Sequence, residues 1–438
     1  MVVFSQLRQA GRRGSEPVHC RFQTPPAEAG WISAAEGAKT PQNRRRPAKI
    51  AMLGSFPPLR GISSYCFELA GALARQVSLE FISFKKMYPR FLYPGGDLKD
   101  DPTFPLKSLP NLRVKRNLTW YNPLSWLREM LEARADLLHV QWRSLPLAPV
   151  IACVALGYKL RGKSVVFTIH NVLGHEQRTL FCKVSGALFR LGDHFIVHTA
   201  ANRKQLIERF QIEPQRISRV AHGILGLFRP PQADPAEIRA AFGYEPHHRV
   251  ILVFGAIRPY KGLMTALRAF AALQRRLHHA RLLVAGQLWE PWDRYQLEID
   301  RLGIAAAVGT HRDYIAADQV HRYFTAADLV WLPYLRFDSQ SGVGSTALAF
   351  EKPMIVTAVG GLPELVGDRR FVVPPEDAGA LAETTFGCLN DPKMLQQMTR
   401  AIRIRAREHQ WPAIARQTCS VYQSVLDAQV CKAKAAVP

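Results

Sequence analysis

Two cations stand where a predicted strand passes into a predicted helix. In residues 253–270, VFGAIRPYKGLMTALRAF, a short apolar run ends at Gly255, Arg258 and Lys261 follow in a loop, and Gly262 begins an amphipathic segment. The amino end of a helix and nearby cations both attract anions, especially phosphates. A guanidinium and an ammonium together suit a diphosphate, because it offers several charged oxygens. The alternative is that both cations are ordinary solvated surface charges.

Two further loops have the composition of an anion-binding turn. Residues 54–65, GSFPPLRGISSY, place Gly61 where a ligand or another segment could approach the backbone closely, although a plain turn would look the same. Residues 333–350, PYLRFDSQSGVGSTALAF, place Ser339, Ser341 and Gly342 where backbone N–H groups would point at an anion. This last loop is not a Walker loop, because no Gly-Lys-Ser/Thr follows, and ordinary helix capping is its alternative.

The elements that must position these loops alternate between strands and helices. Strand-like apolar runs occur at residues 48–56, 77–84, 137–142, 164–170 and 194–199, and then at 249–255, 280–286, 327–334, 352–361 and 370–375. Such alternation is typical of an α/β fold with doubly wound parallel sheets, in which ligands bind beyond the carboxyl ends of the strands. We therefore expect two successive Rossmann-like domains that face a cleft.

Composition suggests where these domains begin and end. Residues 1–47 mix Arg, Gly, Pro and Gln without periodicity, which indicates a disordered basic leader, although a mistaken start site would look the same. The proline-bearing stretch 228–237 is expected to link a first domain, 48–228, to a second, 229–410, with a C-terminal helix in 411–438. The apolar run 145–158 is too short to span a bilayer and is expected to form a buried helix.

The chain is strongly basic, with a formal net charge of +23. Residues 1–49 hold nine Lys/Arg against three Glu, a surplus of six, so about seventeen positive charges lie on the remainder. Such an excess suits nucleic acid, anionic lipid or phosphorylated substrates, unless it reflects a generally Arg-rich composition. No zinc spacing or RNA-binding aromatic motif supports nucleic acid as the partner. The seven cysteines form no C-x-x-C pair, which favours free thiols in a reducing cytosol, and no metal-ligand spacing occurs.

Several motifs, taken in order, resemble the retaining glycosyltransferases of the GT-B fold, the large group that includes sucrose synthase and bacterial mannosyl- and exopolysaccharide transferases. The similarity spans about residues 48–428 and is carried by RGISSYCFELAGAL, VVFTIHNVLGHE, VAHGI, VFGAIRPYKGLMTALRAF, LLVAGQ, FTAADLVWLPY and KPMIVTAVGGLPELV. The resemblance implies transfer of a sugar from a nucleotide diphosphate sugar to a hydroxyl, with retention of configuration. It also implies no cofactor, no obligatory metal, and a C-terminal helix that returns to the first domain.

The resemblance also supplies roles for single residues. Gly61 is expected to face the donor diphosphate, His170 to contact the transferred sugar, and Lys261 to grip the diphosphate. The backbone of RDYI, which contains Tyr314 and Ile315, is expected to bracket the nucleobase. The expected acceptor side holds His175 and Glu176.

This chain departs from the family at three positions. Asp338 and Thr346 stand where the family usually has two glutamates eight residues apart, and Ala256 stands where it usually has an arginine. We expect Arg258 to substitute for that arginine, and Ser339, Ser341 and Gly342 to bind the donor through backbone and hydroxyl groups. A non-catalytic relative and a nucleotide-sugar epimerase of the same architecture remain alternatives.

The acceptor is expected to be a glycan or a polyprenyl-linked molecule. Basic segments at 84–90, 113–116 and 158–163 could hold the first domain on anionic lipid. A cytoplasmic protein with peripheral contact at the inner face of the plasma membrane would follow, and a merely soluble basic enzyme is the alternative.

Overall fold

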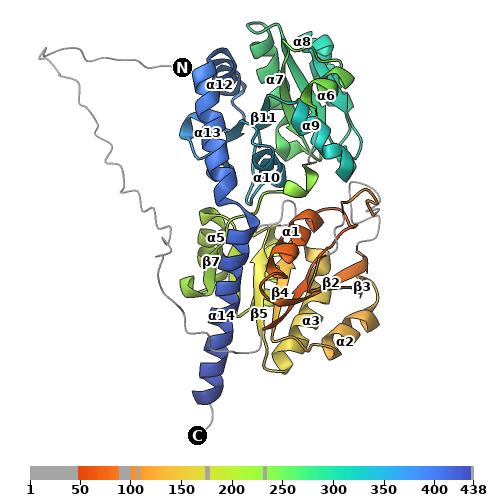
Figure 1. Ribbon diagram of the computed structural model, residues 1–438, viewed down its shortest axis with the longest axis vertical. Helices are drawn as coiled ribbons and strands as arrows, with labels where there is room; N and C mark the ends of the chain where they lie inside the picture. Colours follow the sequence, from red (N-terminus) through yellow and green to blue (C-terminus); the bar gives the residue numbers. More distant parts are fainter. Residues whose placement is uncertain (1–47, 88–99, 106–108, 173–177, 230–233, 436–438) are drawn as a thin grey trace, which may run out of the picture. The chain divides into compact units, whose positions relative to one another are not determined.

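The computed structural model describes residues 48–87, 100–105, 109–172, 178–229 and 234–435, so the leader expected at 1–47 lies outside the described residues. Two parallel sheets, each flanked by helices, make up the described chain (Figure 1). The α/β architecture with two doubly wound parallel sheets is therefore confirmed.

The first sheet has seven parallel strands in the order β3-β2-β1-β4-β5-β6-β7. The interior strand β1 buries four consecutive residues, as expected where helices cover both faces of a parallel sheet. The strands are β1 (Lys49–Leu53), β2 (Ser78–Lys86), β3 (Leu112–Thr119), β4 (Leu137–Trp142), β5 (Ser164–Ile169), β6 (His194–Val197) and β7 (Ile217–Arg219). The helices are α1 (Ser63–Leu73), α2 (Pro123–Leu131), α3 (Ala148–Leu160), α4 (Arg178–Phe189) and α5 (Ala200–Phe210).

The second sheet has six parallel strands in the order β10-β9-β8-β11-β12-β13. The strands are β8 (Arg249–Phe254), β9 (Ala280–Ala285), β10 (Val308–His311), β11 (Leu329–Leu332), β12 (Met354–Thr357) and β13 (Val372–Val373). The helices are α6 (Pro235–Ala241), α7 (Leu263–Gln274), α8 (Asp293–Leu302), α9 (Val320–Ala326), α10 (Gly342–Ala349), α11 (Leu362–Val366), α12 (Ala378–Asn390) and α13 (Pro392–Glu408).

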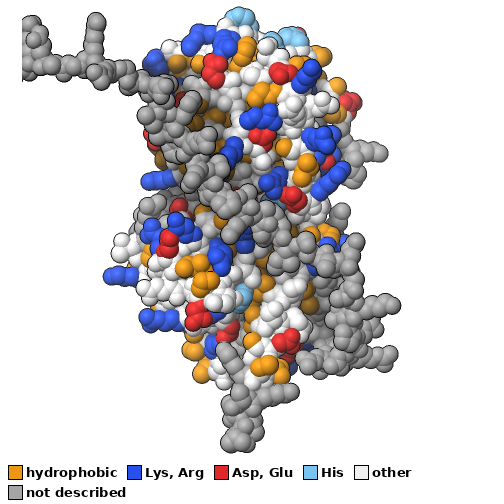
Figure 2. Space-filling model, turned by 90° about the vertical axis from the view of Figure 1, so that its left-hand side faces the viewer, with side chains coloured by type: hydrophobic (Ala, Val, Ile, Leu, Met, Phe, Trp, Pro, Cys, Tyr) orange, Lys and Arg blue, Asp and Glu red, His pale blue; other side chains and the backbone are white. Residues whose placement is uncertain are grey.

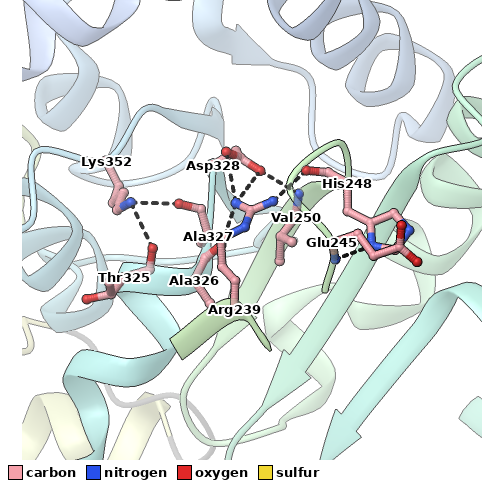
Figure 3. Close-up of polar contacts among 9 residues, drawn as sticks. All are labelled: Arg239, Glu245, His248, Val250, Thr325, Ala326, Ala327, Asp328 and Lys352. Atoms are coloured by element: carbon pink, nitrogen blue, oxygen red, sulfur yellow. Dashed lines mark hydrogen bonds and ion pairs between the residues drawn. The ribbon is translucent and has the colours of Figure 1, made fainter. Parts of the chain in front are cut away.

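A polar network closes the amino edge of the second sheet (Figure 3). Asp328, just before β11, accepts a hydrogen bond of 2.7 Å from the backbone N–H of Val250 in β8 and pairs with Arg239 of α6 at 3.2 Å. The Lys352 ammonium donates to the carbonyl oxygen of Ala327 at 2.7 Å. Because these groups are largely withdrawn from water, the network fixes how α6 and the two central strands meet.

The last helix, α14 (Trp411–Ala435), packs against the first sheet although it follows the second in the chain (Figure 1, blue). Its buried side chains join the core that contains α1 and β1. The chain passes between the sheets twice, and the two passages are joined: Ile224 N–H donates to His409 O at 3.1 Å, and the Trp411 indole donates to Ile224 O at 2.6 Å.

The helix expected at 145–158 is confirmed as a short 3₁₀ turn followed by α3. Three strands were missed: β3, β7 and β10. The basic segment 113–116 is part of β3, an edge strand in which Lys115 pairs with Glu80 at 2.9 Å and Arg116 with Asp100 at 3.0 Å. Figure 2 shows one face of the molecule, on which cations are scattered among acids instead of forming one patch.

Candidate active site

The loop that follows β8 is held against the end of β11 by a glycine. Gly262 has a φ of +72°, and a Cβ there would lie 1.9 Å from the Pro333 carbonyl oxygen, so no other residue fits without displacing the backbone. The neighbouring Leu335 N–H donates to Tyr260 O at 2.8 Å. This close approach places Lys261 beside the carboxyl end of β11.

Lys261 is hydrogen-bonded to the first of two hydroxyl groups that contact each other. Its ammonium donates to the Tyr334 hydroxyl at 3.0 Å, and that hydroxyl lies 3.1 Å from Ser341 Oγ. Ser341 caps α10 by accepting from the Gly344 N–H at 3.2 Å. Burial, assisted by the nearby Arg258 charge, lowers the pKa of Lys261. No acid in the described residues forms an ion pair with Lys261, whose ammonium meets a neutral hydroxyl instead, so its charge is available to an anionic ligand.

Arg258 lies flat on an aromatic ring that the sequence analysis did not single out. Its guanidinium carbon is 3.3 Å from the centroid of the Trp289 ring. The loop that carries Trp289 is joined to the Arg258 loop by backbone hydrogen bonds, from Ile257 N–H to Gln287 O at 2.8 Å and from Trp289 N–H to Ile257 O at 3.1 Å. The two loops therefore form one rigid unit at the carboxyl edge of β8 and β9.

The segment between β11 and α10 touches the first sheet. Ser339 is buried, and its hydroxyl donates to the carbonyl oxygen of His170, while the carbonyl oxygen of Asp338 accepts from the Asn202 amide. Gly342 is the first residue of α10, so its N–H is among those that an α-helix leaves unpaired. Thr346 is buried, and its hydroxyl donates to Gly342 O in its own helix at 2.9 Å.

On the first sheet, Gly61 lies against a cation that was not predicted. Its φ is +97°, and a Cβ there would lie 2.6 Å from Nη1 of Arg143, which directly follows β4. The position of Arg143 after a strand was the signal that could have identified it. Gly61 thus keeps space beside a guanidinium, as an anion-binding loop requires.

His170 lies at the end of β5 and is buried. Its Nε2 is 2.9 Å from Gln141 Oε1, and the edge of its ring meets Tyr65, with centroids 4.8 Å apart. Burial, and then the neighbouring His198 and His222, hold the pKa of His170 well below its ordinary value. The imidazole is therefore neutral at neutral pH and can act only as a hydrogen-bonding group there.

Tyr314 and Ile315 follow β10. The Tyr314 hydroxyl donates to Asp101 Oδ2 at 2.8 Å, and the Arg60 guanidinium lies 3.5 Å from the centre of its ring. Burial opposes ionisation of Asp101, yet hydrogen bonds from Thr103, Tyr314 and the Ala317 N–H hold its pKa below the usual value. The predicted acceptor-side residues His175 and Glu176 lie outside the described residues.

The structure therefore groups Arg258, Lys261, Ser341 and Gly342 at the carboxyl edge of the second sheet, and brings His170 to Ser339. Within the described residues, no group of three or more His, Cys, Asp or Glu could hold a metal ion. In that same part of the chain, no helix is long and apolar enough to cross a bilayer.

Two family models match the chain, one on each sheet. The model described as "Glycosyltransferase Family 4" matches residues 59–224, and the model described as "Glycosyl transferases group 1" matches residues 248–391. The second match contains Arg258, Lys261 and Ser341, and the first contains Gly61 and His170.

Curated relatives carry the name D-inositol 3-phosphate glycosyltransferase. The protein of Segniliparus rotundus is 31% identical over 251 residues, which are 55% of this chain and 54% of that protein. The protein of Mycobacterium marinum is 37% identical over 182 residues, which are 40% of this chain and 37% of that protein. In these matches the chain spans about half the length of its curated relatives, or less.

Solved structures share the fold at low identity. Anabaena Alr3699/HepE in complex with UDP superposes with a TM-score of 0.66 at 17% identity, over 86% of this chain and all of that one. Sucrose-phosphate synthase from Thermosynechococcus elongatus gives a TM-score of 0.67 at 20% identity, over 87% of this chain and all of that one. With both family models matched and the fold shared, the chain belongs to the GT-B glycosyltransferases of the family 4-like type.

Proposed function

We propose that the protein transfers a sugar from a nucleotide diphosphate sugar to a hydroxyl of a glycan or lipid-linked acceptor, with retention of configuration. The observation that carries the proposal is the setting of Lys261: a partly buried ammonium, hydrogen-bonded to a neutral hydroxyl, beside Arg258 and the capped amino end of α10. A diphosphate is the ligand that such a cluster of positive potential suits best. The UDP found in the Anabaena structures makes a UDP-sugar the first donor to test.

The reaction is governed by the leaving group. The bond between the anomeric carbon and the diphosphate breaks and its electron pair goes to the diphosphate, while the acceptor oxygen bonds to the anomeric carbon and its proton passes to the departing diphosphate oxygen. Lys261 and Arg258 stabilise the negative charge that grows on the diphosphate. His170 is neutral, so it can hydrogen-bond a sugar hydroxyl without adding positive charge beside an oxocarbenium-like carbon.

The cations also support transfer without a metal or cofactor. Arg258, Lys261 and the N–H groups at the start of α10 supply the positive potential that a divalent ion would otherwise provide. Activity that persists after treatment with a chelator is the expected result, and activity restored only by added metal would contradict it.

The experiment that tests the function is a thermal-shift panel of UDP-, GDP- and ADP-sugars followed by product analysis with and without an acceptor. One donor is expected to protect the fold strongly, because a ligand that binds only the native state raises its stability. Transfer should require the acceptor. A new sugar formed without any acceptor would favour an epimerase, and binding without turnover would favour a non-catalytic protein.

We also propose a peripheral membrane contact. The exposed apolar side chains of α2 support it more than the basic segments do. Lys159 and Lys163 of the basic segment at 158–163 pair with Asp193 and Asp136, at 2.8 and 3.5 Å. By contrast, α2 turns apolar side chains outward, and Leu124 and Leu131 are 74% and 69% exposed. We propose that this face meets an anionic bilayer, where each leucine that leaves water contributes about 1.5 kcal/mol or more.

The membrane proposal has a matched control. In co-sedimentation with vesicles that contain anionic lipid, the double variant Leu124→Ser and Leu131→Ser should lose most of its binding. The control Leu297→Ser removes a leucine that is 70% exposed on α8, beside the second sheet, and should bind like the parent protein. Equal binding of all three proteins would refute the assignment of this face.

A further inference from the structure

A buried line of hydrogen bonds joins the C-terminal helix to His170. The Tyr422 hydroxyl, on α14, is 2.6 Å from Nδ1 of His139, and Nε2 of His139 is 3.1 Å from the amide nitrogen of Gln141. Thr168 Oγ1 also lies 2.7 Å from that Nε2. At the far end, Gln141 Oε1 is 2.9 Å from Nε2 of His170. All five side chains are buried, so water does not compete for these groups.

Both imidazoles in the line are neutral. Burial, with a smaller effect of His198, lowers the pKa of His139 to about 3, and burial likewise holds the pKa of His170 well below its ordinary value. Each ring therefore carries one N–H, on one of its two nitrogens.

The amide of Gln141 determines which ring nitrogen carries the proton in each of the two histidines. An amide nitrogen only donates, so Nε2 of His139 accepts, and the proton of His139 sits on Nδ1 and is donated to the Tyr422 oxygen. An amide oxygen only accepts, so the proton of His170 sits on Nε2 and is donated to Gln141. Nδ1 of His170 is then left with a lone pair, as a hydrogen-bond acceptor.

We propose that Tyr422 is a positioning residue that sets the tautomer of His170 through His139 and Gln141. Without the Tyr422 hydroxyl, Nδ1–H of His139 has no acceptor in a dry site, which is costly. The proton of His139 then moves to Nε2, where Thr168 Oγ1 can accept it, but the N–H would also face the donating amide nitrogen of Gln141. The Gln141 amide therefore turns to present its oxygen. The amide nitrogen now donates to Nε2 of His170, whose proton must move to Nδ1.

The effect on catalysis rests on the proposed function, whereas the effect on the tautomer does not. If His170 accepts a hydrogen bond from a sugar hydroxyl through Nδ1, a proton on that atom removes the interaction. The loss of one neutral hydrogen bond of this kind corresponds to a fall of about tenfold in kcat/KM.

The test is nitrogen NMR of the full chain labelled with ¹⁵N-histidine, in which the His170 signals are assigned by their loss in His170→Asn. In the parent protein, His170 should carry its proton on Nε2. In Tyr422→Phe it should carry it on Nδ1, and kcat/KM should fall about tenfold. The control Thr418→Val alters a buried hydroxyl of the same helix that bonds only within α14, to Ile414 O at 2.9 Å, and should leave the tautomer unchanged.

Several outcomes overturn the proposal. A proton on Nδ1 of His170 in the parent protein does so without any variant, which keeps the test decisive if Tyr422→Phe does not fold. An unchanged tautomer in folded Tyr422→Phe, or the same change in Thr418→Val, also overturns it. A tautomer change confined to Tyr422→Phe supports it. If the tautomer changes only in Tyr422→Phe but the protein has no transferase activity, the role of Tyr422 is still supported and only the proposed function is contradicted.

Discussion

Replacing Lys261 with methionine should separate activity from stability. Lys261 is partly buried and its hydrogen-bond partner is the neutral Tyr334 hydroxyl at 3.0 Å, so no acid of the described residues is paired with its charge before the donor binds. Two unit charges about 4 Å apart interact by about 4 kcal/mol at an effective dielectric constant of about 20. Loss of one such donor to a developing oxyanion costs about 3 kcal/mol, so kcat/KM should fall by two orders of magnitude or more.

Although kcat/KM should fall in Lys261→Met, the stability of the fold should not. Methionine nearly preserves the length of the side chain and removes a partly buried charge that has no acidic partner, so the free energy of unfolding should stay the same or rise. The assay pairs initial rates of sugar transfer with thermal denaturation of the same samples. A loss of rate without a loss of stability cannot be attributed to misfolding.

Lys352 supplies the matched control. It is also a partly buried lysine, and burial lowers its pKa, but its ammonium donates to backbone carbonyls at the amino edge of the second sheet (Figure 3). Lys352→Met should leave the Ala327 carbonyl without its donor and lower the melting temperature, while kcat/KM per folded molecule stays unchanged. Near-normal kcat/KM in Lys261→Met, or parallel losses of rate in both variants, would refute the role of Lys261.

Three further predictions concern the same half of the chain. Trp289→Ala should lower kcat/KM about tenfold by releasing the Arg258 guanidinium, and Trp289→Phe should restore part of it, because a smaller ring still offers a face for stacking. Asp328→Asn should destabilise the fold by about 2 kcal/mol in denaturant titrations, because the ion pair with Arg239 is lost and one of the two carboxylate oxygens, which accept from Arg239 and the Val250 N–H, becomes a donor. Because burial lowers the pKa of Lys261, kcat/KM should decline on the alkaline side at a pH below 10.5, and this decline should be absent in Lys261→Arg. Between the lowered pKa of Lys261 and 10.5, this lysine is protonated in the unfolded chain but not in the folded one, so the free energy of unfolding of the parent protein should rise with pH. The same rise should be absent in Lys261→Met.

The sequence predicted the central strands well, because strands covered on both faces must be apolar throughout. β1, β8 and β11 are such runs, and each is buried almost completely. The edge strand β3 was missed, because Leu112–Thr119 mixes cations with apolar residues and resembled a basic surface segment. Two of its cations, Lys115 and Arg116, pair with acids of β2 and a neighbouring loop, and a local sequence pattern does not reveal such long-range pairs.

The candidate site was predictable where a residue follows a strand, and not where it acts across the fold. Arg258, Lys261 and Ser341 all follow strand ends, and parallel strands bring such residues to one edge. Trp289 also follows a strand, but its role depends on the stacking of two loops, which spacing does not reveal. Tyr422 lies far along the chain and reaches His139 only because α14 packs against the first sheet.

One of the three departures from the family, Thr346, can be understood from the charge around Lys261. Thr346 lies one turn into α10, where a glutamate would place a carboxylate close to the helix that Ser341 caps. Such a carboxylate would offset the positive potential of the helix end and of Lys261 before a donor arrives. With a threonine whose hydroxyl is bound within its own helix, that potential stays available to the diphosphate. Recognition of the donor should therefore depend more on its diphosphate and less on its sugar hydroxyls than in relatives that keep both glutamates.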